Sequence, residues 1–436
     1  MALIAVLLLA GCMRTGYSWN STPPPAQAAP SSISPVMANQ GQQMASNQNF
    51  DITIGNERNT AMAGQPSPAP ASVATAPNAT MSAPVKVAIL LPLSGSHADI
   101  GQALLNAAQL ALFDMGSHSF ELVPRDTGGT AQGAEKAMRS ALSDGAQLIL
   151  GPLFAPQVKA CSPIAAQANV NMIAFSTDWS LAGGNTYIMG FLPFGQVQRI
   201  VNYAASRGLR RIGVLAPSDE YGNAVMNAYN AEARHDGITT VDIVRFPAGR
   251  VDLSSVVSNF DHVADRTANP AAPPPFDAVL IAVGGNQART IANQLSTDGL
   301  NPEQVRRLGI GLWDDQGLSV EPGMQSAWFA APSPDLRRTF EKRYTDTYGT
   351  NPPRLATLGY DATALAAVLA RNGDNGSGIF SRAAITNPNG FAGVDGVFRF
   401  LPNGLAERGL GVLTFHGGTI AVEDQAPRTF QMWNSQ

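Results

Sequence analysis

Short apolar runs alternate with longer amphipathic stretches from Val85 onward, and this alternation limits the possible folds more than any other feature of the sequence. The run Val85–Leu93 has the composition of a buried strand, and Gly101–Met115 after it has the spacing of an amphipathic helix. Strands and helices that alternate in this way form parallel sheets with helices on both faces. The alternation continues to Ser176 and begins again at Gly195–Ser206, so the sequence predicts an α/β fold with two doubly wound, Rossmann-like lobes.

The last third of the chain follows a different pattern. Two stretches, Asp335–Tyr348 and Arg354–Leu369, have helical spacing, and Ser333 is expected to cap the first of these helices. The tail Val394–Val422 instead alternates apolar and polar residues around glycine-containing turns. We therefore expect C-terminal β-hairpins after the two lobes.

Composition excludes several classes of function. The chain has 28 Lys and Arg residues against 32 Asp and Glu residues, which provides no basic surface for nucleic acid. Two cysteines and five scattered histidines show no metal-ligand spacing, so neither a metal nor a cofactor is expected. No nucleophile elbow, phosphate-binding loop or dinucleotide fingerprint is present in the sequence, and we expect a protein that is not an enzyme.

The N-terminal residues have the pattern of an export signal. An apolar run far shorter than the ~20 residues of a membrane-spanning helix ends at Leu9-Ala10-Gly11-Cys12, which resembles a bacterial lipobox. Residues 1–11 would then be the signal peptide, and Cys12 would be the lipidated first residue of the mature protein. We expect the protein to contact the membrane only through this anchor, on the periplasmic face of the outer membrane. Cys161 would remain as a buried thiol in an Ala-rich helix.

A linker is predicted between the lipid anchor and the folded body. Residues 13–84 contain ten prolines and only four charged residues, a composition typical of disordered chain. Together with Cys12 they form the expected tether, residues 12–84. As a flexible coil it would span roughly 45–50 Å, enough to let the body reach a partner away from its anchor.

Ligands of open α/β sheets bind beyond the carboxyl ends of the strands, so the loops that follow the strands supply the candidate ligand-binding residues. These loops contain small hydroxyl residues, free backbone amides and aromatic side chains, which suit a small polar ligand. The candidates are Ser94, Gly95, Leu153, Phe154, Ser176, Thr177, Asp178, Trp179, Tyr221, Gly284, Gly285, Asn286, Trp313 and Asp314. For Ser94-Gly95 a simple turn is an equal alternative, and either tryptophan could instead anchor the edge of a lobe.

Several segments, taken in order, resemble the type I periplasmic binding proteins of the leucine/isoleucine/valine-binding group. They are Val87–Gly95, Leu150-Gly151-Pro152, Ile173–Thr177 and Ile212–Leu215 followed by Tyr221-Gly222. The resemblance implies two lobes joined by crossing strands, with a cleft that closes on a ligand. Lobe 1 would then comprise residues 85–192 plus about 326–378, and lobe 2 residues 193–325 plus about 379–436.

The sequence departs from the amino-acid-binding members of this group at two places. Leu153-Phe154-Ala155 offers no hydroxyl group for a carboxylate, and Gly284-Gly285-Asn286 stands where the group has an acidic residue for the ammonium. A closer resemblance, carried by Pro124–Gly129 and Ala174–Asp178, is to lipid-anchored penicillin-binding protein activators. The first hypothesis is therefore a regulator that docks on a peptidoglycan synthase. The alternative is the substrate-binding protein of an ABC importer, which would deliver an amino acid or another small polar solute to the permease.

Overall fold

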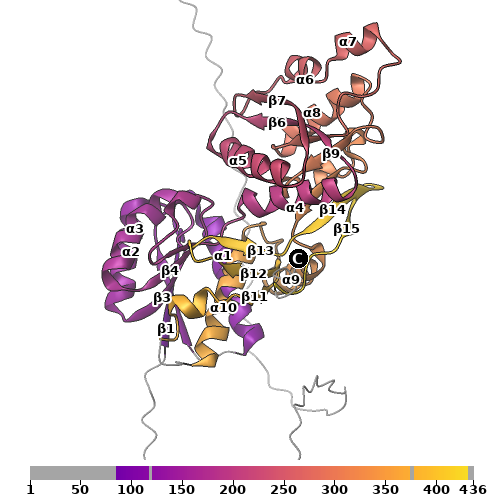
Figure 1. Cartoon of the computed structure of the whole chain (residues 1–436). Coiled ribbons are helices and arrows are strands. Elements are labelled where there is room, and N and C mark those ends of the chain that lie inside the picture. The colour runs from indigo at the N-terminus through magenta and orange to yellow at the C-terminus, as the bar shows by residue number, and fades with distance from the viewer. Residues whose placement is uncertain (1–84, 117–119, 374–377, 431–436) are drawn as a thin grey trace, which may run out of the picture. The chain divides into compact units, whose positions relative to one another are not determined.

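The computed structural model describes residues 85–116, 120–373 and 378–430. The described residues all belong to one compact unit, and the expected signal peptide, lipidated Cys12 and tether lie outside them. Within the described part of the chain, no helix combines the length and the apolar character needed to cross a bilayer. The predicted fold is confirmed, because two lobes are each built on a largely parallel sheet covered by helices (Figure 1).

Lobe 1 is built on a five-stranded parallel sheet. In spatial order its strands are β2 (Phe120–Asp126), β1 (Val85–Leu91), β3 (Ala146–Leu150), β4 (Asn171–Ala174) and β5 (Thr186–Ile188). Successive side chains of β1 enter opposite cores, Val87 and Ile89 on one face and Ala88 and Leu90 on the other. This explains why the strand is an uninterrupted apolar run and does not alternate with polar residues.

Two pairs of helices cover the two faces of the lobe 1 sheet. One pair is α1 (Ala98–Met115) with α10 (Ala356–Asn372), and the other is α2 (Ala131–Ser143) with α3 (Ala155–Ala168). Cys161 lies in α3 and is fully buried, as predicted for a small apolar residue. The helix α9 (Pro334–Tyr348) packs along α1, and Ser333 stands at its N-cap position without accepting an amide hydrogen bond, so the predicted side-chain cap is wrong.

Lobe 2 contains a seven-stranded mixed sheet. In spatial order its strands are β15 (Thr419–Asp424), β14 (Gly411–His416), β10 (Trp328–Ala331), β9 (Arg306–Gly309), β8 (Ala278–Ile281), β6 (Arg211–Pro217) and β7 (Thr239–Phe246). The five strands from β10 to β7 are parallel, and β14 and β15 extend the sheet as an antiparallel hairpin.

Helices also cover both faces of the lobe 2 sheet (Figure 1). One face carries α4 (Pro193–Ser206) and α5 (Glu220–His235). The other carries α6 (Ser254–Phe260), α8 (Gly285–Thr297) and the short turns η2 (Gly311–Trp313), η3 (Gln316–Leu318) and η4 (Pro322–Met324), with α7 (Val263–Ala268) following α6.

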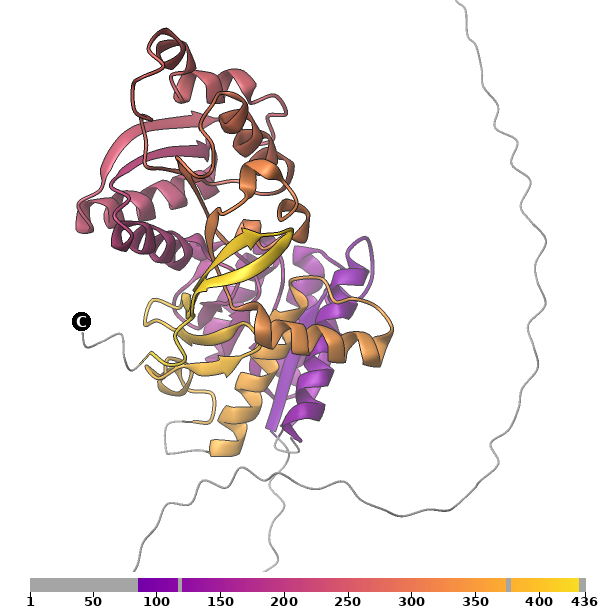
Figure 2. The same ribbon diagram turned by 90° about the vertical axis from the view of Figure 1, so that its right-hand side faces the viewer.

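The C-terminal strands, yellow in Figure 2, divide between the lobes. The small antiparallel sheet β11 (Phe391–Gly393), β12 (Gly396–Phe400) and β13 (Ala406–Arg408) follows the short helix α11 (Arg382–Ile385). Its residues Phe398 and Phe400 belong to the core of lobe 1, and β10 belongs to the sheet of lobe 2. The expected lobe boundaries near residues 326 and 379 therefore differ from the structure. The chain crosses between the lobes after β5, β10 and β13.

Candidate functional site

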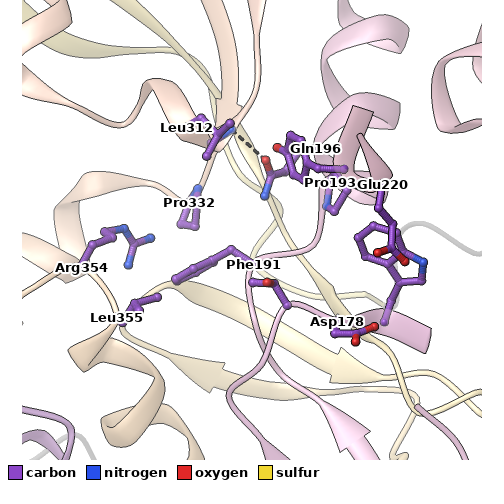
Figure 3. Close-up of a pocket in the computed structure, with 13 residues that line it drawn as sticks. Asp178, Phe191, Pro193, Gln196, Glu220, Leu312, Pro332, Arg354 and Leu355 are labelled. Atoms are coloured by element: carbon purple, nitrogen blue, oxygen red, sulfur yellow. Dashed lines mark hydrogen bonds between the residues drawn. The ribbon is translucent and has the colours of Figure 1, made fainter. Parts of the chain in front are cut away.

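A cavity of about 570 Å³ lies between the two lobes (Figure 3). Its walls come from the segments that follow β4, β6 and β9, at the carboxyl ends of the strands where ligands of this architecture bind. The lining residues are Thr177, Asp178, Trp179, Phe191, Pro193, Gln196, Glu220, Tyr221, Gly311, Leu312, Pro332, Arg354 and Leu355. The volume falls in the range of small-molecule sites.

The loop after β4 forms the lobe 1 wall of this cavity. Ser176 is 4% exposed, and its hydroxyl accepts a hydrogen bond from the Asp178 amide at 3.0 Å. Asp178 Oδ1 in turn accepts from the Ser180 amide at 3.1 Å, which starts the turn η1 (Trp179–Leu181). The ring of Trp179 packs edge-on against Phe194 with 5.3 Å between centroids. These contacts fix the loop so that Thr177, Asp178 and Trp179 line the cavity.

The start of α5 forms the facing wall on lobe 2. Asp219 caps the helix by accepting from the Gly222 amide at 2.8 Å, and a Cβ atom on Gly222 would lie 1.9 Å from the carbonyl oxygen of Pro217. Only glycine therefore allows this close helix start. Burial and the negative charge of Asp219 raise the pKa of Tyr221 far above its ordinary value, so its phenol stays protonated. The carboxylate of Glu220 lies beside the cavity.

The third wall is formed by the segments that cross between the lobes. Phe191 follows β5 and lies below the guanidinium of Arg354, with Cζ 4.3 Å from the ring centroid. Arg354 also pairs with Asp395 at 2.9 Å and with Asp314 at 3.3 Å. Gln196 of α4 accepts a hydrogen bond from the Gly311 amide at 2.8 Å and so holds the turn after β9.

A network of buried charges lies behind Arg354. Burial alone would raise the pKa of Asp395, but Arg354 and Arg408 hold it below its ordinary value. Burial and the neighbouring Asp395 raise the pKa of Asp361 to about 7. Asp314 of lobe 2 pairs with Arg337 of α9, which links the lobes through charge. The positive charge of Arg354 is therefore offset by carboxylates of the protein itself before any ligand enters.

The structure brings four of the residues predicted from sequence into this cavity: Thr177, Asp178, Trp179 and Tyr221. Ser176 lies below the same loop, where its hydroxyl supports the backbone. The other predicted residues do not line this cavity.

Two of the predicted clusters follow strands of lobe 1. Ser94 and Gly95 form an exposed turn after β1, where the Ser94 amide donates to Asp126 Oδ1 at 3.2 Å. Leu153 and Phe154 follow β3, and the ring of Phe154 packs on His97 with 4.8 Å between centroids. Both clusters lie at the carboxyl ends of lobe 1 strands and do not line the cavity.

The remaining predicted residues belong to lobe 2. Gly284, Gly285 and Asn286 start α8, with Gly284 packed closely on Leu312. Trp313 is fully buried and donates its indole N–H to the Val283 carbonyl at 2.7 Å. Trp313 is thus an anchor of the lobe 2 core, and Asp314 belongs to the charge network.

Sequence reasoning missed the wall that the crossing segments provide. The lining residues absent from the prediction are Phe191, Pro193, Gln196, Glu220, Gly311, Leu312, Pro332, Arg354 and Leu355. Glu220 is the first residue of α5 and directly precedes Tyr221, which the sequence does predict. No periodicity marks Phe191, which lies between β5 and α4. Arg354 is the first residue of the predicted helix Arg354–Leu369 but lies before α10, which begins at Ala356.

One group of side chains within the described residues has the proximity of metal ligands. Ligand atoms of Glu232, His235 and Asp236 at the end of α5 lie within 4.8 Å of one another. The His235 ring pairs with Asp236 at 2.9 Å, and His235 is exposed. The contact between His235 and Asp236 is a surface hydrogen bond, and this group lies outside the lining of the interlobe cavity.

Two α/β lobes joined by three crossings, with a cavity between them, define a bilobal binding protein. The chain belongs to the periplasmic binding protein family, because the sequence profile of that family matches residues 84–418. This family is non-enzymatic, in agreement with the sequence prediction. The resemblance to its leucine/isoleucine/valine-binding group is confirmed, whereas nothing in the comparisons supports the activator branch.

Two curated relatives match part of the chain. Leu/Ile/Val-binding protein homolog 6 of Brucella abortus is 26% identical over 184 residues, which cover 40% of this chain and 47% of the relative. Uncharacterized protein RP748 of Rickettsia prowazekii is 24% identical over 141 residues, which cover 32% of this chain and 38% of the relative. The chain thus matches less than half the length of these relatives.

Solved structures match the chain more extensively. A candidate branched-chain amino acid ABC transporter of Rhodospirillum rubrum has a TM-score of 0.69 at 18% identity, covering 78% of this chain and 99% of that one. A branched-chain amino acid substrate-binding protein of Streptococcus pneumoniae, in complex with isoleucine, has a TM-score of 0.55 at 20% identity and covers 79% and 100%. A solute-binding protein of Rhodopseudomonas palustris with 3,4-dihydroxybenzoic acid has a TM-score of 0.57 at 18% identity and covers 78% and 96%. At these identities the matches establish the fold.

Proposed function

We propose that this protein is the substrate-binding component of an ABC importer and carries a small solute in the cavity between its lobes. The observation that carries the proposal is the cavity of about 570 Å³, which takes lining residues from both lobes. A ligand there would contact both lobes at once and so favour the arrangement that encloses it. Aromatic side chains, among them Trp179 and Tyr221, would cover an apolar body, and a few polar groups would set its orientation.

The comparisons favour this function over docking on a peptidoglycan synthase, which was the first hypothesis from the sequence. The structurally similar proteins named above are described as parts of transporters, two of them as parts of ABC transporters, and two of the three hold small organic ligands. A branched-chain amino acid is one candidate solute, and an aromatic compound is another. The activator hypothesis keeps only its sequence basis. That basis is the Pro- and Ala-rich residues 12–84, the departures at Leu153–Ala155 and Gly284–Asn286, and the resemblance carried by Pro124–Gly129 and Ala174–Asp178.

We further propose that lipidation of Cys12 retains the protein at a membrane, with residues 13–84 as the tether. An anchored binding protein would stay near its permease, which raises the local concentration of the loaded form. The outer-membrane location belongs with the activator hypothesis, and a location beside an inner-membrane permease belongs with the importer hypothesis.

Two measurements test the importer function. First, the tagged full chain is purified from its own envelope in detergent, and we expect an ABC permease to co-purify. Recovery of a peptidoglycan synthase without a permease would reverse the order of the two hypotheses.

Second, native mass spectrometry of the purified chain should detect a bound small molecule that is released on denaturation. Trp179→Ala is expected to lower the bound fraction at least tenfold because the ring is part of the cavity wall. Phe113→Ala is the matched control, since Phe113 is an aromatic residue 80% exposed on α1 and outside the cavity lining. Equal loss in both variants would contradict a role of the cavity in binding.

A further inference from the structure

The charges that line the interlobe cavity are unevenly distributed. Its thirteen lining residues include two carboxylates, Asp178 and Glu220, and one cation, Arg354. Figure 3 shows the two carboxylates on one side of Phe191 and Arg354 on the other. The acidic end and the cationic end of the cavity can therefore be considered separately.

The cationic end is already neutralised by protein groups. Arg354 Nη1 donates to Asp395 Oδ2 at 3.1 Å and to Thr357 Oγ1 at 3.0 Å, while Nη2 pairs with Asp395 Oδ1 at 2.9 Å and Nε with Asp314 at 3.3 Å. The side chains of Asp314 and Asp395 are only 4% and 0% exposed. Because two buried carboxylates already offset its charge, Arg354 would attract a ligand carboxylate less strongly than an unpaired arginine would.

The acidic end of the cavity, in contrast, has carboxylate oxygens without protein hydrogen-bond partners. Among the described residues, the Glu220 carboxylate makes no hydrogen bond or ion pair, and Asp178 uses only Oδ1, for Ser180. Asp219 adds a third negative charge, which contributes to the raised pKa of Tyr221. Asp178 and Glu220 line the cavity, and Arg354, the one cation among its lining residues, lies at the other end.

Aromatic rings accompany the acidic groups. Trp179 lies next to Asp178 in the same loop, and Tyr221 follows Glu220 in the first turn of α5. Both rings line the cavity, and Trp and Tyr faces attract organic cations through their quadrupoles. Because burial keeps Tyr221 protonated, its hydroxyl remains available as a donor, and the ring adds no charge of its own.

We infer that the solute carried in this cavity is an organic cation, an amine or quaternary ammonium with an apolar body and no carboxylate. Its charged group lies between Glu220 and Asp178 against the rings of Trp179 and Tyr221, and its apolar part extends toward Phe191 and Leu312. This inference rests on the proposed function, since it names the chemical class of the carried solute. It departs from an amino acid because two buried carboxylates already offset the charge of Arg354, the one cation among the residues that line the cavity.

The test compares molecules of nearly equal shape and different charge by calorimetric titration of the full chain. The probes are 2-phenylethylamine as the cation, 2-phenylethanol as the neutral molecule, 3-phenylpropanoate as the anion and phenylalanine as the zwitterion. Choline and putrescine extend the set of cations. We expect at least one cation to bind tenfold or more tightly than the neutral, anionic and zwitterionic probes, with affinity that falls as salt is added.

Charge variants then locate the binding. Glu220→Gln and Asp178→Asn are each expected to weaken cation binding about five- to tenfold and to leave 2-phenylethanol unaffected. Glu303→Gln removes an exposed carboxylate of lobe 2 that does not line the cavity, and it should change neither affinity. Thermal unfolding midpoints within a few degrees of the unaltered protein ensure that the variants are folded.

Three results would overturn the inference. If the anion or phenylalanine binds most tightly, the cavity is a carboxylate or amino-acid site and the importer function stands. If cations bind equally well to the Glu220→Gln/Asp178→Asn double variant, they bind elsewhere. If no cation binds at 1 mM, the cationic class is wrong, and the permease pull-down decides separately whether the importer function survives.

Discussion

The guanidinium of Arg354 lies 4.3 Å from the centroid of the Phe191 ring and at the same time pairs with Asp314 from lobe 2 and Asp395 from lobe 1. One side chain thus forms part of the cavity wall and part of the connection between the lobes. Arg354 therefore connects binding in the cavity with the geometry of the segments that cross between the lobes.

Loss of the Arg354 charge should destabilise the protein. In Arg354→Met, the buried carboxylates of Asp314 and Asp395 lose a cation, and removal of one partner of a buried pair lowers the free energy of unfolding by about 3 kcal/mol. Arg338→Met is the control, because Arg338 pairs with Asp335 on the exposed face of α9. It should change the free energy of unfolding by less than about 0.5 kcal/mol. Equal urea midpoints for the two variants would contradict this role.

Stability should depend on pH through Asp261. Burial and the neighbouring Asp298 raise the pKa of this fully buried carboxyl group to about 7. Because the folded state holds the proton more tightly than the unfolded state, the free energy of unfolding falls as pH rises from about 4 to about 7 and is constant above.

The variant Asp261→Asn isolates this contribution. Its amide oxygen can still accept from the Val263 amide, as Oδ1 of Asp261 does at 2.9 Å, and its side chain carries no titrating charge. Relative to the unaltered protein, the variant should gain about 2–4 kcal/mol between pH 4 and pH 8. Chemical unfolding across this range measures the difference, and a difference independent of pH would show that Asp261 titrates normally.

Two glycine substitutions should have opposite effects. A Cβ atom on Gly359 of α10 would lie 2.4 Å from the Leu104 carbonyl oxygen of α1, so Gly359→Ala must separate two packed helices and should cost about 2–3 kcal/mol. Gly195 lies inside α4, and a Cβ atom there would meet nothing within 4 Å. Gly195→Ala should stabilise by about 0.5–1 kcal/mol through helix propensity. Thermal unfolding measures the stability of both variants. A Gly359→Ala variant as stable as the unaltered protein would show that α1 and α10 can separate without cost.

The proposed lipid anchor depends on one thiol. Cys12→Ser should release the protein from membranes, because serine cannot take up the thioether-linked lipid. Fractionation after a carbonate wash provides the measurement, with Cys161→Ser as the control, since Cys161 is buried in α3. Cys12→Ser that stays with the membrane fraction would exclude this anchor.

The sequence predicts the lobes and four of the thirteen residues that line the cavity for the same physical reason. Parallel strands buried on both faces are apolar throughout, and their carboxyl ends share one sheet edge, so Thr177 and Tyr221 could be placed near a ligand in advance. Phe191 lies in a segment without periodicity and Arg354 at the very start of a predicted helix, and only the meeting of the lobes gives them a role. For Trp313, the neighbouring Asp314 suggested a ligand contact, yet the ring fills the lobe 2 core.

The same limit applies to the C-terminal hairpins. Alternation of apolar and polar residues predicts that Phe398 and Phe400 face a core, but not which of two cores receives them. The parallel bridge between Ile188 and Leu405 and the packing of both phenylalanines decide in favour of lobe 1.

The pairing of β14 with β10 depends on a strand that is synthesised long after β10. The strand β14 is separated from β10 by all of the later lobe 1 segments, from α9 to β13. A growing or truncated chain that ends near residue 405 therefore leaves β10 as an open sheet edge with unpaired backbone groups. Such an edge is a template for pairing with a second chain. In the folded chain the β14–β15 hairpin covers β10, and the outermost strand on this side of the sheet is β15.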